Sequence, residues 1–148
     1  MAWTTPRTWT TGELVTAAIM NAHVRDNQGV LNPAGVSFVI DGGGAAITTG
    51  SKIPWSVPWS CTVDRWDLMG DSPSDLAIEI YAVGVGSWPG SAHSINSGSP
   101  AYCASSACGQ DSSPSAWSAL TKGEQALVVV SSVNGITKGT LTLYLNRT

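Results

Sequence analysis

Helical periodicity is confined to one short stretch near the N-terminus, and everything after Pro33 has the pattern of strands and loops. The stretch runs from Thr11 to about Asn27 and predicts a helix over residues 11–28, after a polar lead. Beyond it, short runs alternate apolar with polar residues between glycines, prolines and an Asn-Gly pair, which favours antiparallel sheet. The expected fold is therefore mainly β: a jelly-roll-like β-sandwich preceded by a short N-terminal α-helix.

The predicted helix has a recognisable start and end. Thr10 can cap the backbone N–H of Glu13 while the Glu13 carboxylate bonds back to the Thr10 N–H, which is a capping box. Gly29 ends the pattern, and Asn32-Pro33 prevents its return. In between, apolar residues recur at three- and four-residue steps and form one stripe: Leu14, Val15, Ala18, Ile19 and Ala22.

A lone helix of this length is marginal in water, so its stripe must be buried against the β-domain, other copies of the chain or a larger assembly. The stripe is narrow and its side chains are small, which suits packing between symmetric copies, three-fold or otherwise. We expect residues 1–32 to anchor and oligomerise the chain as a homotrimer, and residues 33–148 to form the β-sandwich. Near the helix end, Arg25 and Asp26 either pair between chains or form a solvated last turn.

The composition narrows the range of partners. Only 11% of the residues are charged, whereas about a quarter is usual. Such a low charged fraction suits a surface that contacts other proteins, or an ordinary β-domain of a secreted or viral protein. The net charge of −3, with scattered Lys and Arg, argues against a nucleic-acid partner. The sequence has no apolar run of about 18 residues to span a membrane. Its N-terminus also lacks the basic start and apolar core of a signal peptide.

Several segments have strand character, and we expect six to eight strands in all. Pro54 and Pro58 cannot donate to a ladder, so the segment that holds them is an edge strand or an extended rim. Turn chemistry occurs at residues 41–44 and 71–75, and Asn134-Gly135 is a hairpin signal. The expected strands cover residues 36–40, 53–59, 61–69, 76–83, 125–130 and 139–145, with a further short extended piece at 45–51.

Residues 84–115 are expected to form a long loop, rich in Ser, Gly, Ala and Pro. Aromatic faces stack on sugars or fill pockets on partners, and this loop holds the best candidate contact patch: Trp88, His93, Asn96 and Tyr102. Trp66 and Trp117 are expected in the core or sealing loops instead. Cys103 and Cys108 could close a small disulfide or remain two thiols. Too few other ligands lie nearby to favour a metal site, and no cofactor is expected.

The sequence favours a protein that is not an enzyme. His23 is expected to be exposed or at an interface. His93, Asp111 and a serine could be assembled into a hydrolytic triad, but no nucleophile-elbow motif supports it. One group of spaced acidic residues fits neither a glycosidase pair nor a calcium loop closely and favours a surface turn: Asp64, Asp67, Asp71 and Asp75.

The segment TPRTWTTGELVTAAIMNAHVRDN resembles the N-terminal signature of small structural proteins of tailed bacteriophages. In that signature a Trp- and Pro-containing lead precedes T-x-G-E-x-V-T-A and then N-x-x-V-R-D-N. The matching positions are Trp9, Gly12, Glu13, Val15, Thr16, Ala17, Asn21, Val24, Arg25, Asp26 and Asn27. Two further segments, which begin FVIDGGG and WSALTKGEQ, resemble a phage β-domain. The similarity omits residues 84–115, so partner specificity does not carry over.

The resemblance implies a non-enzymatic virion structural protein, made in the host bacterial cytoplasm and displayed on the virion surface. It would be a short appendage, either a capsid decoration or head fibre, or a tail-tip or tail-fibre component. A helix of about 17 residues spans only about 25 Å, which is short for the shaft of a long fibre. The expected partners are other copies and other virion proteins. The alternative is a carbohydrate-binding adhesion module for a host surface glycan, which predicts exposed Trp88 and Tyr102.

Overall fold

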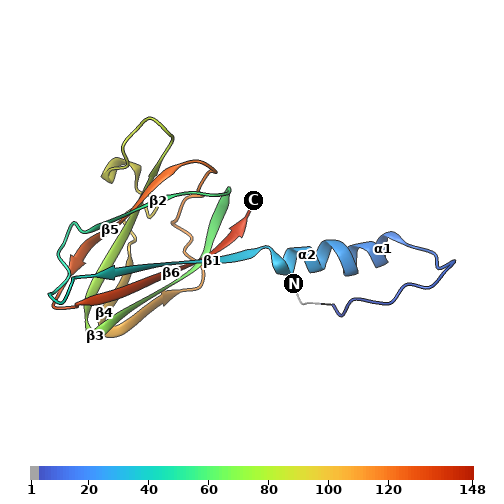
Figure 1. Ribbon diagram of the computed structural model, residues 1–148, viewed down its shortest axis with the longest axis horizontal. Coiled ribbons are helices and arrows are strands. Elements are labelled where there is room, and N and C mark those ends of the chain that lie inside the picture. The colour runs from blue at the N-terminus through green and yellow to red at the C-terminus, as the bar shows by residue number, and fades with distance from the viewer. Residues whose placement is uncertain (1–3) are drawn as a thin grey trace. The chain divides into compact units, whose positions relative to one another are not determined.

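The computed structural model describes residues 4–148, without the side chains of residues 106 and 107. Met1–Trp3, the start of the predicted polar lead, lie outside the described residues. The chain divides into an N-terminal unit that ends at Pro33 and a β-unit, Ala34–Thr148 (Figure 1). This division falls one residue from the predicted boundary at residue 32.

The N-terminal helix begins later than predicted. Its segments are α1 (Ala17–Met20), a π-helical turn (Asn21–Arg25) and α2 (Asp26–Leu31), which follow one another without a break. Thr16 is the N-cap, because its hydroxyl accepts a hydrogen bond from the Ile19 N–H at 3.3 Å. The predicted start at Thr11 is therefore wrong.

The predicted capping box forms only in part. The Glu13 carboxylate accepts from the Thr10 N–H at 3.3 Å, but the Glu13 N–H bonds to the Thr10 backbone carbonyl at 3.1 Å, which makes a turn. At the other end, Gly29 lies inside α2, and the helix continues to Leu31. Asn32 still has helical backbone, and Pro33 ends the helix because it has no N–H to continue the hydrogen bonding.

The β-unit is one curled antiparallel sheet, so the expectation of a mainly β fold behind a short N-terminal helix is confirmed; the jelly-roll topology is not confirmed. The strand order is β1-β6-β3-β5-β2, and β4 also pairs with β3 (Figure 1). The strands are β1 (Pro33–Asp41), β2 (Lys52–Ser56), β3 (Cys61–Val83), β4 (Ala101–Asp111), β5 (Gln125–Val133) and β6 (Lys138–Arg147). A short 3-10 helix, Ser91–His93, lies between β3 and β4.

Strand β3 is the centre of the sheet, and it replaces two predicted strands. Its first half pairs with β6 and its second half pairs with β5, while β4 pairs along the opposite edge of both halves. Strands β5 and β6 therefore lie end to end along β3 and are not neighbours in the sheet. The turn at Asn134-Gly135 is present, with Gly135 at φ +70°, but the predicted hairpin pairing across it is wrong.

Side chains from β3 hold the corner where its two halves meet. The Asp71 carboxylate accepts hydrogen bonds from the Thr137 hydroxyl, the Thr137 N–H at 3.1 Å and the Lys138 N–H at 3.0 Å. The Ser74 hydroxyl donates to the Asn134 carbonyl. These bonds replace ladder pairing at the bend, and they let one strand continue through residues 71–75, where the sequence predicted a turn.

Acidification is expected to weaken this corner. The Thr137 hydroxyl, followed by the backbone N–H groups of Thr137 and Lys138, lowers the pKa of Asp71 below its usual value. Because the folded-state pKa is the lower one, the carboxylate stabilises the fold above about pH 4, and this contribution is lost as the pH falls through the folded pKa. When the pH is lowered below about 4, we expect the melting temperature of the natural chain to decrease. We expect a smaller decrease in Asp71→Asn. Differential scanning calorimetry across this range measures both.

Thr137→Val is the matched variant, because it removes the hydrogen bond that contributes most to the pKa of Asp71. It should also reduce the pH dependence. The carboxyls of Asp41 and Asp67 likewise have lowered pKa values, so part of the dependence remains in both variants. Melting curves of Asp71→Asn that shift with pH as much as those of the natural chain would contradict the role given to Asp71.

The core lies between the two halves of the bent sheet and takes one face of every long strand. In β6, Leu141, Leu143 and Leu145 are fully buried at alternate positions. In β3, a bulge between Val63 and Arg65 shifts the alternation. The buried set also contains Phe38, Ile40, Cys61, Trp66, Leu68, Leu76, Ile78, Ile80, Val128 and Val130.

The bulge explains the mixed faces that the sequence shows between residues 61 and 69. Before it, Cys61 points into the core; after it, Trp66 and Leu68 do. The Trp66 ring stacks on the ring of Trp117, with 6.4 Å between centroids, and Trp117 packs against the core. The expectation that these two tryptophans are structural is confirmed.

Candidate functional site

The lead, residues 4–16, folds back along one side of the helix. The Asn27 side chain is 5% exposed and bonds to both backbone polar groups of Thr4: it accepts from the N–H at 2.9 Å and donates to the carbonyl at 2.8 Å. Within the lead, Arg7 forms an ion pair with Glu13, and its guanidinium lies 5.2 Å from the centre of the Trp9 ring. This side of the helix is therefore covered by its own chain.

Another part of the helix surface carries large apolar side chains that remain exposed. Met20, Val24 and Leu31 are 43%, 38% and 70% exposed. Val24 lies about one turn after Met20 through the π-turn, and Leu31 lies about two turns after Val24, so all three are on one side of the helix. Leu14 and Val15 precede the helix and are also exposed. We call Met20, Val24 and Leu31 the uncovered face.

The predicted oligomerisation stripe is divided between these environments. Leu14, Val15 and Ala18 are exposed, whereas Ile19 and Ala22 are half-buried. The late helix start leaves Leu14 and Val15 outside the helix, and Ala22 lies within the π-turn, where the helical phase changes. Arg25 donates to Asp26 within the same chain at 2.8 Å. Their role in oligomerisation stays a prediction.

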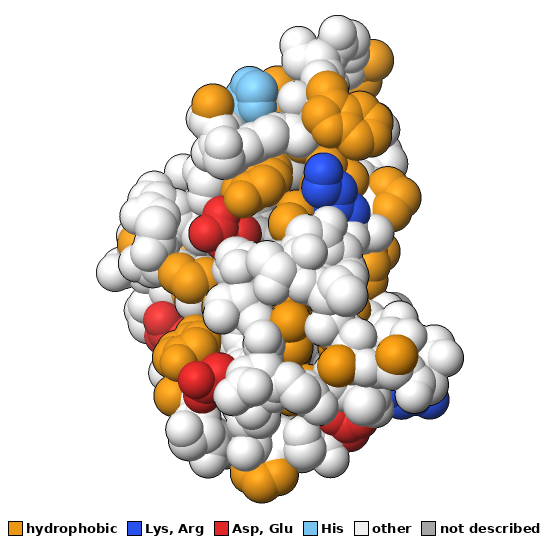
Figure 2. Space-filling view, turned by 90° about the vertical axis from the view of Figure 1, so that its left-hand side faces the viewer, with side chains coloured by type: hydrophobic (Ala, Val, Ile, Leu, Met, Phe, Trp, Pro, Cys, Tyr) orange, Lys and Arg blue, Asp and Glu red, His pale blue; other side chains and the backbone are white. Residues whose placement is uncertain are grey.

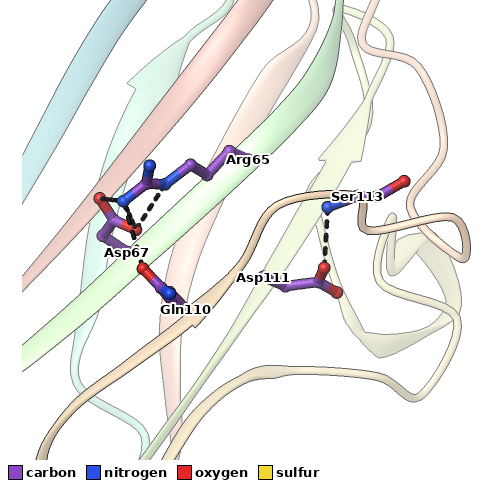
Figure 3. Close-up of polar contacts among 5 residues, drawn as sticks. All are labelled: Arg65, Asp67, Gln110, Asp111 and Ser113. Carbon is purple, nitrogen blue, oxygen red and sulfur yellow. Dashed lines mark hydrogen bonds and ion pairs between the residues drawn. The ribbon is translucent and has the colours of Figure 1, made fainter.

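Figure 3 shows a polar cluster on the exposed side of β3 and β4, where three side chains converge. The Arg65 guanidinium binds the Asp67 carboxylate through two hydrogen bonds, at 2.8 and 2.9 Å, and donates to the Gln110 amide oxygen at 3.2 Å. It also lies 5.1 Å from the centre of the Tyr144 ring on β6. Three strands thus contribute to one network. A groove of about 430 Å³ runs beside it, lined also by Met69 and Cys108.

The charges in this cluster stabilise one another. The hydrogen bond from Arg65 lowers the pKa of Asp67, and the Asp67 carboxylate raises the pKa of Arg65. A hydrogen bond with the same carboxylate raises the pKa of Tyr144. All three groups therefore keep their ordinary charge near neutral pH, as in a fixed polar surface. A nucleophile or general base instead needs a pKa shifted toward neutral pH.

Sequence reasoning missed this cluster, although part of it was visible. Arg65 and Asp67 are two residues apart in a strand, so their side chains share a face. Gln110 lies within the predicted loop 84–115, and no pattern in the sequence indicates that it pairs with Asp67, as it does in the sheet register. Nearby, Asp111 accepts from the Ser113 N–H at 2.8 Å in a local turn (Figure 3).

A second groove, of about 340 Å³, lies where the segment after β3 meets the outer side of β2 and β5. Trp88 stands at its edge and is 74% exposed. The lining comes from three parts of the chain: Pro54, Trp55, Ser56, Ser87, Trp88, Pro89, Gln125, Ala126 and Leu127. We call it the Trp88 groove.

The four predicted contact residues do not form one patch. Trp88 and Tyr102 are exposed, as the carbohydrate alternative predicts, but Tyr102 lies on β4 beside Ala77, outside the Trp88 groove. Asn96 is fully buried, and its side-chain oxygen accepts from the Ile80 N–H at 2.6 Å, so it is structural. His93 accepts at Nδ1 from the Gly90 N–H at 3.3 Å and closes the 3-10 turn.

The predicted long loop is only partly a loop. Residues 101–111 form β4, and the 3-10 turn interrupts the rest. A strand was missed here because Ser, Gly and Ala have low β-propensity, and pairing with β3 overrides that preference.

All three cysteines are thiols in this structure, so the disulfide alternative is not realised. Cys61 and Cys103 are buried, and burial raises the pKa of both thiols, whereas Cys108 is exposed.

We expect one cysteine to react quickly with a thiol reagent in the folded protein and three after denaturation. Mass spectrometry after brief maleimide treatment measures this, with Cys108→Ser as the control. A native protein that takes up no label, and gains two reactive thiols on reduction, would restore the disulfide.

The spaced acidic residues of β3 do not converge. Asp64 accepts from the Asn146 side chain at 3.0 Å, Asp75 accepts from the Ser105 N–H at 2.7 Å, and the other two belong to the corner and to the Arg65 cluster. Among the residues that the structure describes, no group of three His, Cys, Asp or Glu side chains could share a metal ion.

Comparison with known proteins finds no match. No family model matches the chain, and neither a curated protein nor a solved structure resembles it significantly. In the described part of the chain, no helix is both long and apolar enough to cross a membrane.

Proposed function

We propose that this chain is a non-enzymatic structural protein of a tailed-bacteriophage particle, a short trimeric appendage on the virion surface. The observation that carries the proposal is the uncovered face of the N-terminal helix. Met20, Val24 and Leu31 place apolar surface in water on a helix of only fifteen residues, which is marginal alone. Association between copies would bury this face once per chain. The likeness of residues 5–27 to phage structural proteins supports the same function.

The β-unit supplies the displayed part of the appendage. Its sheet has a core of its own, and its surface is nearly free of charge runs. In the face drawn in Figure 2, uncharged side chains predominate, and the acidic and basic ones are few. Neutral polar surface of this kind suits close packing among other particle proteins, since few charges must lose their water on contact.

The proposed position on the particle is one that a short protein can fill. The helix spans about 22 Å at 1.5 Å per residue, and the chain has no repeats from which a long shaft could be built. A capsid decoration, a short head fibre and a tail-tip component all fit this reach. The partners in each case are other copies of the chain and a capsid or tail protein.

Analysis of purified particles tests the proposal. Phage particles are induced from the strain that carries the gene, banded on a density gradient and analysed by quantitative mass spectrometry. The expected result is that peptides of this chain band with the major capsid protein, in a fixed ratio divisible by three. A chain that is abundant in the lysate but absent from banded particles would overturn the proposal.

A further inference from the structure

The Trp88 groove has a rigid edge. The Ser87 N–H bonds to the Gly84 carbonyl, and the His93 N–H bonds to the Gly90 carbonyl, so Trp88 and Pro89 are held between two turns. Gly86 lies at φ +99°, a conformation that favours glycine. Pro89 is buried against the unit while the Trp88 side chain remains 74% exposed. A large aromatic surface is thus kept in water by a fixed backbone.

The floor and the rim of the groove differ in chemistry. Leu127 of β5 is buried and gives the groove an apolar floor, whereas its neighbour Ala126 faces the other side of the strand and belongs to the core. Ser56, Ser87 and Gln125 are exposed and bring two hydroxyls and one amide to the rim. None of the lining residues is charged. A ligand that complements this groove is therefore neutral, has one apolar face, and carries hydroxyl or amide groups around its edge.

We propose that the Trp88 groove binds a neutral carbohydrate. The C–H face of a pyranose ring packs on the indole of Trp88, and the ring hydroxyls exchange hydrogen bonds with Ser56, Ser87 and Gln125. The volume of about 340 Å³ is at the small end of the range for ligand sites, about 300–1,000 Å³, which suits a short oligosaccharide. The ligand class is independent of the oligomeric state proposed above.

Other ligands fit the same surface less well. Nucleotides, phosphopeptides and acidic glycans would meet no positive charge in the lining. A peptide that adds as a strand would need the free edge of β2, but Pro54 in the middle of that strand has no N–H to donate. A proline-rich peptide needs several parallel aromatic ridges, and Trp88 is the one exposed aromatic side chain in this lining, since Trp55 packs against Phe38.

The test uses the full chain labelled with ¹⁵N at tryptophan. Its indole N–H signals are followed by NMR during titration with tetrasaccharides of glucose, galactose, N-acetylglucosamine and rhamnose, and with a proline-rich decapeptide. The signal that disappears in Trp88→Ala assigns Trp88. We expect at least one tetrasaccharide to shift this signal, and calorimetry to show affinity lowered about tenfold or more in Trp88→Ala. Gln125→Ala should also weaken binding.

Tyr102→Ala is the matched control, because it removes another exposed aromatic side chain of the β-unit, outside the groove. It should bind like the natural chain. The proposal fails if no tetrasaccharide shifts the Trp88 signal, if binding survives in Trp88→Ala, or if the peptide alone shifts the signal. Sugar binding by a monomeric chain would leave this proposal standing and contradict only the trimer.

Discussion

Gly109→Ala is expected to destabilise the β-unit by about 3 kcal/mol, as overpacking against atoms that cannot move aside does. A Cβ atom at Gly109 would lie 2.2 Å from the carbonyl oxygen of Tyr102 and 2.9 Å from its carbonyl carbon. Both are backbone atoms of the same strand, β4, so no side-chain rotation relieves the collision. The strand must shift, and it must break pairs with β3 to do so. Urea denaturation followed by tryptophan fluorescence measures the loss.

Gly35→Ala is the matched control for this substitution. Gly35 is also a strand residue, in β1, and a Cβ atom there would have no neighbour within 4 Å. Its stability should stay within about 0.5 kcal/mol of the natural chain. If Gly109→Ala unfolds at the same urea concentration as Gly35→Ala, the close approach of Gly109 to Tyr102 is wrong, and with it the path of β4.

Leu143→Ala is expected to cost about 2–5 kcal/mol, the range for removing a fully buried leucine from a core that cannot collapse around the cavity. Leu143 is fully buried in β6 and lies opposite Trp66 of β3 in the sheet register. It belongs to a core cluster to which several strands contribute, so the cavity cannot close by moving one loop. The midpoint of thermal or urea unfolding should fall accordingly.

Val39→Ala controls for a change in strand propensity without a cavity. Val39 lies in β1 and is 64% exposed, so its truncation should change stability by less than about 1 kcal/mol. Equal losses in the two variants would mean that Leu143 is not in the core, and that the alternation assigned to β6 is shifted by one residue.

The alternation in β6 shows what the sequence could predict. Leu141, Leu143 and Leu145 alternate with Thr142 and Tyr144, and the structure buries the first set and leaves the second set outside. Period-two patterning of this kind depends only on neighbours in the chain, so the fold class and most strands could be predicted from it. The edge position of β2, inferred from Pro54, follows from the same local chemistry.

Strand β3 shows what the sequence could not predict. Residues 71–75 have turn chemistry, and a turn was expected there. The structure continues the strand because the Asp71 carboxylate bonds to Thr137, and the Asp75 carboxylate to Ser105. Those partners are distant in the sequence, and no local pattern identifies them. The predicted helix start was wrong because Thr10 and Thr16 are both suitable N-cap residues, and the Thr10–Glu13 interaction closes a turn instead of a helix.

The carbohydrate interpretation of the loop stays a prediction, and the structure separates the four residues that it grouped. Trp88 is exposed, as the carbohydrate interpretation predicts. Asn96 was misplaced, because a polar loop residue looks the same in sequence whether it meets water or caps the buried Ile80 N–H. Gln125 and Leu127 could not be predicted as residues of the candidate site, because only the fold brings β5 beside Trp88.

The central claim, that copies of this chain associate through the uncovered face, is tested most directly by the solution mass of the full chain. Light scattering at micromolar concentration should give three times the 15.3 kDa of one chain. The double variant Met20→Asp, Val24→Asp should give the mass of one chain, because two charges per copy would be buried without partners. Val85→Asp, which places a charge at an apolar position of the β-unit that is 79% exposed, should remain a trimer. If the natural chain is a monomer at micromolar concentration, the claim is contradicted.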